Sequence, residues 1–189
     1  MKHLLLLPLL LLAACQEEVT QDTSPVALTE TAAGYYCQMT LLEHDGPKAQ
    51  IHLSGLPGAP LFFSQVRDAV AYARMPEQSH AILAIWVNDM GAEGASWAAP
   101  GATNWVDATQ AYFVVGSQIK GGMGAPEIVP FATAAAANAF VQQHGGAVMR
   151  FDDIPDSAAL APIAEPDPTS AEDQDFEDRL RALSRQPKG

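Results

Sequence analysis

The sequence carries a thiol and a thioether one residue apart, at Cys37 and Met39. Residues 36–41 predict a strand, and side chains two residues apart on a strand point to the same face of the sheet. A thiolate beside a thioether is a soft donor pair that favours Cu(I), because a thioether is a poor ligand for zinc. Burial is the alternative, since a free cysteine also packs as a small hydrophobic residue.

Met123 is a third sulfur donor, placed in the glycine-rich run of residues 121–124. Its glycine neighbours offer no side chains for packing, so we expect the loop to display the thioether and to approach a site closely. The alternative is a methionine folded back to fill a gap in the core. Met75, Met90 and Met149 lie in or beside predicted helices and strands, and we interpret them as packing residues.

Two histidines could complete a metal site. His44 follows the Cys37 strand in a predicted turn, and His52 lies on the next predicted strand, residues 49–53, which we expect to pair with it. Isolated histidines are more often surface residues than ligands, so both are secondary candidates. His80 and His144 flank the ends of predicted helices and are interpreted as structural.

The common signatures of enzyme sites are missing from the sequence, including G-x-S-x-G, C-x-x-C, H-E-x-x-H, the Walker loop and G-x-G-x-x-G. The glycines of residues 121–124 precede Pro126 and a strand, so they do not form a phosphate-binding loop. A thiol enzyme built on Cys37 is an alternative, but no local residue marks a partner base. We therefore expect a protein that is not an enzyme.

Charge and cysteine content exclude several classes of protein. The 189 residues suffice for one ordinary domain, and their formal net charge is −12. Nucleic-acid binding needs a basic face, so this balance argues against it. Two cysteines cannot build a disulfide-dense scaffold, a four-thiolate iron–sulfur site or an all-cysteine zinc site.

The N-terminus predicts a signal peptide followed by a lipidation site. Residues 1–14 predict a signal peptide whose leucine run is too short to span a bilayer. Leu12-Ala13-Ala14-Cys15 resembles the lipobox of bacterial lipoproteins, in which the cysteine is acylated. We therefore predict a protein lipidated at Cys15, facing the periplasm and anchored to a membrane. Gln16 replaces the Asp typical of inner-membrane retention, which indicates the outer membrane; an ordinary signal peptide is the alternative.

The remaining chain divides into four parts. Residues 15–34 are polar and lack aromatic residues, which predicts a flexible tether. Residues 35–91 and 92–155 each predict two strands, a helix and a strand. Residues 156–189 are acidic and contain proline, which predicts a disordered tail.

An internal repeat relates the two halves, because Phe63–Ala73 aligns without gaps on Phe131–Val141. The first of these segments predicts a helix capped by Ser64 and ended by Arg74 or Met75, ahead of Pro76. The second predicts an alanine-rich helix that ends near His144. The predicted fold is α+β, with two small ββαβ halves packed together.

These features together resemble the NosL family of nitrous-oxide reductase accessory lipoproteins. The resemblance covers residues 35–153. It rests on the lipobox and on five segments of the folded part: Tyr36–Met39, the Phe63–Arg74 helix, Thr103–Tyr112, the run from Met123 to Phe131, and Gly145–Val148. It implies a fold of two ββαβ halves and one bound Cu(I), held by Cys37, Met39 and Met123. The family often has Gly between the Cys and the Met, whereas this chain has Gln38, expected to point away from the site.

The resemblance also implies a function and partners. A family member would be a lipid-anchored Cu(I) chaperone that supplies copper for maturation of nitrous-oxide reductase outside the cytoplasm. Its partner would be the apo reductase or the membrane complex that assembles the reductase's copper sites. The alternative is a lipoprotein binding or assembly module of the cell envelope whose sulfur residues are only core.

Overall fold

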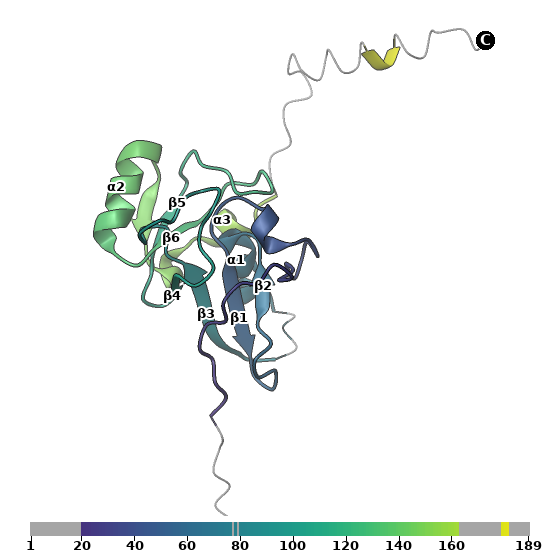
Figure 1. Ribbon diagram of the computed structural model, residues 1–189. Coiled ribbons are helices and arrows are strands. Elements are labelled where there is room, and N and C mark those ends of the chain that lie inside the picture. The colour runs from purple at the N-terminus through teal and green to yellow at the C-terminus, as the bar shows by residue number, and fades with distance from the viewer. Residues whose placement is uncertain (1–19, 77, 79, 163–178, 182–189) are drawn as a thin grey trace, which may run out of the picture.

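The computed structural model describes residues 20–76, 78, 80–162 and 179–181. In chain order its strands are β1 (Ala49–Leu53), β2 (Leu61–Phe63), β3 (Ile82–Asn88), β4 (Trp105–Asp107), β5 (Tyr112–Val115), β6 (Val129–Phe131) and β7 (Ala147–Met149). The helices are α1 (Val66–Arg74), α2 (Ala134–His144) and α3 (Asp156–Leu160), with 3₁₀ turns η1 (Leu41–Glu43) and η2 (Phe151–Asp153). Figure 1 shows these elements gathered in one body, with α2 at its outer edge.

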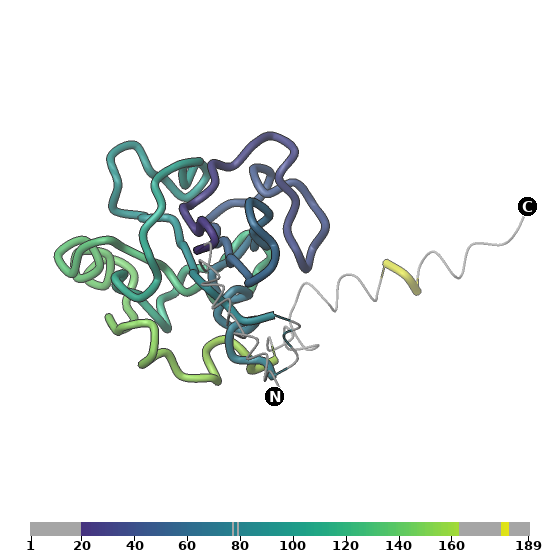
Figure 2. Tube along the Cα trace, turned by 90° about the horizontal axis from the view of Figure 1, so that it is seen from below, coloured from purple at the N-terminus to yellow at the C-terminus, as the bar shows by residue number. Residues whose placement is uncertain are grey.

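Two antiparallel sheets of matching topology form the body. The first has the strand order β2-β1-β3-β4, and the second has the order β6-β5-β7. Along the chain, α1 connects β2 to β3 in the first sheet and α2 connects β6 to β7 in the second. The two helices therefore occupy equivalent positions. The predicted fold of two ββαβ halves is therefore confirmed. Figures 1 and 2 show the halves side by side.

The sequence repeat corresponds to this repeated topology. Phe63 ends β2 and Phe131 ends β6, and in both halves the helix begins three residues later. The α1 face buries Val66, Ala69 and Val70, at the spacing of one helical face. The core continues from this face to Phe113, Ile128 and Ile154 of the second half, and this shared core joins the two halves.

Residues 36–41 do not form the predicted strand. Their backbone turns back on itself, because Gly34 N–H donates to the Met39 carbonyl at 3.0 Å and Leu41 N–H donates to the Ala32 carbonyl at 2.9 Å. The first half takes its second strand from β2 instead, a three-residue run to which the sequence assigned no strand. The β-forming residues around Cys37 were a misleading signal, since local hydrogen bonds satisfy their backbone.

The boundary between the halves also differs from the prediction. Residues 104–107 were expected to begin the first strand of the second half, but β4 pairs with β3 in the first sheet, with Val106 opposite Val87. The 92–155 segment therefore contributes its first strand to the other half. A strand's partner depends on the path of the preceding loop, which a pattern of apolar residues does not specify.

Residues 20–34 lie against the first sheet, although they were predicted to be a tether. The amide of Gln50 accepts a hydrogen bond from Val26 N–H at 2.8 Å and donates one to the Val26 carbonyl at 2.9 Å. Leu28 and Ala32 are buried beside Leu41. This cover explains why all five residues of β1 are buried, including polar Gln50.

The signal peptide, Cys15 and the rest of the predicted tether, residues 16–19, lie outside the described residues. Within the described part of the chain, no helix is long and apolar enough to cross a membrane.

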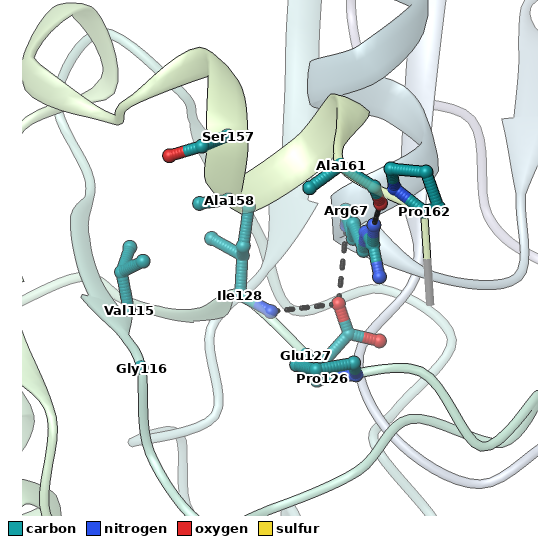
Figure 3. A pocket seen from close by; sticks show the side chains of 10 residues that line it. All are labelled: Arg67, Val115, Gly116, Pro126, Glu127, Ile128, Ser157, Ala158, Ala161 and Pro162. Carbon is teal, nitrogen blue, oxygen red and sulfur yellow. Dashed lines mark hydrogen bonds between the residues drawn. The ribbon is translucent and has the colours of Figure 1, made fainter. Parts of the chain in front are cut away.

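The beginning of the predicted tail is folded. Helix α3 packs against α1 and buries Ala159. The guanidinium of buried Arg67 donates through Nε to the Ala159 carbonyl at 3.2 Å and through Nη2 to the Ala161 carbonyl. Figure 3 shows Ala161 beside Arg67, at one wall of a small pocket. Of the remaining tail, residues 163–178 and 182–189 lie outside the described residues.

We predict that ending the chain at residue 155 lowers its stability, whereas ending it at residue 162 does not. The shorter chain leaves the buried Arg67 guanidinium without its two carbonyl acceptors, at a cost of about 1–3 kcal/mol. Urea denaturation of both truncations beside the full chain measures the difference. Equal midpoints for the three chains would show that α3 contributes nothing.

Candidate metal site

A tight turn of residues 33–40 positions Cys37 and Met39. Ala33 and Thr40 form an isolated β-bridge at its base, and Gln38 N–H donates to the Gly34 carbonyl at 2.9 Å. Cys37 is partly buried, and Met39 is 42% exposed. The thiol and the thioether are therefore presented from a turn and not from one face of a strand.

Gln38 adopts a left-handed backbone conformation, with φ of 56°. Glycine reaches this region without steric cost, whereas other residues rarely adopt it. The Gln38 side chain hydrogen-bonds back to the Tyr35 carbonyl at 2.7 Å. The left-handed backbone explains why glycine suits the position between Cys and Met. The hydrogen bond to Tyr35 helps glutamine to occupy the same position.

The Cys37 thiol has two close neighbours. Its Sγ donates to the hydroxyl of buried Ser64 at 3.6 Å. On its other side a Cβ at Gly34 would lie only 2.5 Å from this sulfur, so the position has room for glycine alone. Ser64 was predicted to cap α1; the N-cap is Gln65, and Ser64 contacts the thiol instead.

Met123 stands at the tip of a second tight turn. Gly121 N–H donates to the Ala125 carbonyl and Gly124 N–H to the Gly121 carbonyl, both at 2.8 Å. Gly124 has a φ of 80°, which only glycine adopts readily. The Met123 side chain is 45% exposed, which is the displayed thioether that the sequence predicted.

Glycine contacts bring this loop against the Cys37 side of the molecule. A Cβ at Gly121 would overlap the amide of Gln65, the residue after Ser64. A Cβ at Gly122 would lie 2.9 Å from the Asp45 carbonyl and 3.1 Å from Cβ of His44. The loop before Met123 therefore packs directly on the His44–Asp45 backbone and on Gln65, the neighbour of the Ser64 that contacts the Cys37 thiol.

His44 lies at this contact, and its Nε2 is buried without a hydrogen-bond partner among the described residues. His52 has other surroundings. It pairs with Ala84 on β1, is almost fully buried, and bonds through Nε2 to Gln50 at 3.1 Å. Burial lowers the pKa of His52. The strand expected to place it beside Cys37 is absent, so the structure brings His44 to the candidate site and leaves His52 in the core.

A buried lysine fixes the backbone that follows Met39. The Lys48 ammonium donates to the carbonyls of His44 at 2.6 Å, of Asp45 at 3.4 Å and of Gly46. Burial lowers the pKa of Lys48 to about 8, and the charges of Glu127, Asp45 and Cys37 counteract that shift. In the sequence, the only sign of this role was the position of Lys48, a charged residue directly before the predicted strand of residues 49–53.

Glu127 holds the other end of the Met123 loop. One carboxyl oxygen accepts from Arg67 N–H at 3.1 Å and from Ile128 N–H at 2.9 Å, as Figure 3 shows. The other oxygen is buried, faces Gly121 and has no hydrogen-bond partner among the described residues. Burial raises the pKa of Glu127 to about 8. Its side chain thus ties the loop to the first turn of α1.

The site offers two thioethers, one thiol and one imidazole. Among the described residues, no three His, Cys, Asp or Glu side chains form a group that could hold a metal ion. A hard divalent cation, which prefers several oxygen ligands, finds no such set here. The donors present suit a soft monovalent ion.

The sequence model of NosL matches residues 25–159. The chain belongs to the NosL family. Copper-binding lipoprotein NosL of Achromobacter cycloclastes is 56% identical over 175 residues, which cover 93% of this chain and 90% of the relative. Copper-binding lipoprotein NosL of Stutzerimonas stutzeri is 34% identical over 150 residues, covering 79% and 75% of the two chains.

The fold agrees with a solved NosL structure. The crystal structure of the copper chaperone NosL from Shewanella denitrificans superposes with a TM-score of 0.64 at 32% identity, covering 70% of this chain and 96% of that chain. The family match begins ahead of buried Leu28 and ends at Ala159 of α3. Residues 25–34 and 154–159, which extend the folded body beyond 35–153, therefore lie within the NosL match.

We predict that Glu127→Gln changes how stability depends on pH. The folded state holds the Glu127 proton up to a pKa of about 8, against an ordinary value of 4.5. Between these values the folded chain binds more protons than the unfolded chain, so its free energy of unfolding falls as pH rises, by an order of a few kcal/mol. Glu127→Gln should lack this slope in urea denaturation from pH 4.5 to 8.5.

The control for this experiment is Glu43→Gln, because Glu43 is an exposed acid of the same region. That variant should keep the slope of the parent chain. Parallel curves for the parent and Glu127→Gln would contradict the expectation that Glu127 is protonated in the folded state.

Proposed function

We propose that this NosL-family chain is a Cu(I) chaperone that holds one ion through Cys37, Met39 and Met123. The observation that carries the proposal is the packing of the Met123 loop against Gln65 and the His44–Asp45 backbone, next to the thiol at Ser64. This packing supports a site in which the three sulfur donors, from distant parts of the sequence, share one ion. The names of the relatives, copper-binding lipoprotein and copper chaperone, agree with that chemistry.

The chemistry of the donors supports Cu(I). A thiolate neutralises the single charge of Cu(I), and two thioethers add soft donors without adding charge. Zn(II) would keep a net positive charge on this set and would gain little from the thioethers. His44 is the candidate fourth donor, because its unpartnered Nε2 lies in the segment that contacts Gly122.

The exposure of the donors supports a role in transfer. Met39 and Met123 are both more than two-fifths exposed, so a partner's ligands can reach the ion while Cys37 still holds it. Stepwise replacement of thioethers avoids a free Cu(I) ion in water. The recipient in this proposal is apo nitrous-oxide reductase or the membrane complex that assembles its copper sites.

We predict that Cys37→Ser nearly abolishes Cu(I) binding, because it removes the charged ligand. Met39→Leu and Met123→Leu keep volume and apolarity but delete sulfur, so each should weaken binding while leaving apo stability almost unchanged. His44→Gln tests the fourth donor. Anaerobic competition titration against a colorimetric Cu(I) chelator measures the affinities, and Zn(II) should compete poorly.

Gly122→Ala provides a control of geometry. It keeps every donor, but its Cβ would meet the Asp45 backbone, so the loop must shift and binding should weaken. Met149→Leu is the matched control for loss of a thioether, because Met149 lies on β7 of the second sheet and packs against the core, and it should bind as the parent does. If Met123→Leu binds as tightly as the parent, the loop takes no part and the three-sulfur site is wrong.

Membrane attachment is a separate part of the proposal. The lipobox supports acylation of Cys15 and an anchor at the outer membrane, with the folded body in the periplasm. We predict that Cys15→Ala moves the protein to the soluble fraction or leaves it unprocessed. Fractionation of cells expressing either form tests this. A Cys15→Ala protein that is processed and still membrane-bound would contradict lipid anchoring through this residue.

A further inference from the structure

A second cavity has none of Cys37, Met39 or Met123 among its lining residues. Its volume is about 280 Å³, and it opens between the loop after β3 and the last turn of α2. Met90, Trp97, Ile119, Phe140 and His144 line it, together with the small residues 95–96. A thioether, an imidazole and an indole therefore face one small space, and no carboxylate is among the lining residues.

The two donors are held by independent parts of the backbone. Met90 follows β3, and its N–H donates to the Pro130 carbonyl of β6 at 3.0 Å. His144 ends α2, and its carbonyl accepts from Gln118 N–H at 3.0 Å. The His144 ring packs on Phe140, with ring centroids 4.4 Å apart. Its ring nitrogens have no hydrogen-bond partner among the described residues.

Trp97 forms the wall of the cavity that contacts Gly46, close in sequence to His44. Its carbonyl accepts from Gly46 N–H at 2.7 Å, and its ring lies over Gly46, where a Cβ would be 2.9 Å from Cζ2. The indole is thus fixed by close contact with the backbone that follows His44. An indole face attracts a cation placed over it, and the attraction strengthens where water is excluded.

We infer that this cavity is a second binding site for one soft monovalent cation, Cu(I), with Met90 and His144 as ligands and the Trp97 ring as a further wall. Thioether sulfur and neutral imidazole both suit Cu(I), and two such donors satisfy an ion that accepts low coordination numbers. The lack of a charged ligand makes the site weaker than one with a thiolate, and selects against divalent ions. The inference uses none of the three sulfur donors proposed above, so it stands apart from that site.

Ag(I) is the probe, because it shares the softness of Cu(I) and does not change oxidation state under these conditions. The Cys37→Ser chain, which lacks the thiolate of the first site, is loaded with Ag(I) and examined by native mass spectrometry. We expect it to retain one ion. Adding Met90→Leu or His144→Gln should remove that ion, whereas adding Met149→Leu or His80→Gln should not.

Tryptophan fluorescence gives a second readout that does not depend on mass. Ag(I) should quench the emission of the Cys37→Ser chain, and adding Trp97→Phe should remove most of that quenching. Melting curves of the apo variants establish that each is folded.

Failure of this site and failure of the first site give different results. If the parent binds Ag(I) but Cys37→Ser binds none, the second site is wrong and the thiolate site stands. Suppose that Cys37→Ser keeps one ion. If adding Met149→Leu removes that ion as fully as adding Met90→Leu does, the assignment to Met90 and His144 is wrong. It is also wrong if neither Met90→Leu nor His144→Gln removes the ion. If Cys37→Ser loses no ion relative to the parent, the first site is wrong.

Discussion

The close approach of the glycine backbone at residues 121–122 to Gln65 and Asp45 is the contact on which the candidate site depends. A side chain at either glycine would collide with these groups, so only glycine lets the second half touch the first at this point. Without this contact, Met123 would be a methionine on an unrelated loop. With it, the loop that carries Met123 packs against the residue that follows Ser64 and against the backbone that follows His44.

Buried charges hold the two sides of this contact in place. Lys48 ties three carbonyls of one segment together, and Glu127 ties the loop to α1. Each is almost completely buried, which is costly unless hydrogen bonds compensate. The glutamate is only partly compensated, because one of its oxygens has no partner among the described residues. Burial therefore favours its neutral form, and the direction of its pKa shift follows from that cost.

The candidate donors could be named from the sequence, but their local geometry could not. Cys37 and Met39 stood out by their spacing and Met123 by its glycine neighbours, and the helix repeat was visible because apolar spacing reports buried faces. The strand assigned to Cys37 was wrong, since Gln38 takes a left-handed conformation that residue type does not announce. The cover over Gln50 was also missed, because hydrogen bonds to a polar side chain leave no apolar pattern in residues 20–34.

The contrast between frame and donors bears on how such a site can both hold and release an ion. The frame is buried: Ser64, Gln65, Lys48 and Glu127 are nearly inaccessible. The thioethers are exposed on two turns anchored to that frame. In the proposed chaperone, a frame that positions the donors in advance would lower the entropy cost of binding. Exposed neutral thioethers would be exchanged one at a time, and the partly buried thiolate would be the last ligand to leave. Tight binding and transfer would then be compatible, because different residues would supply them.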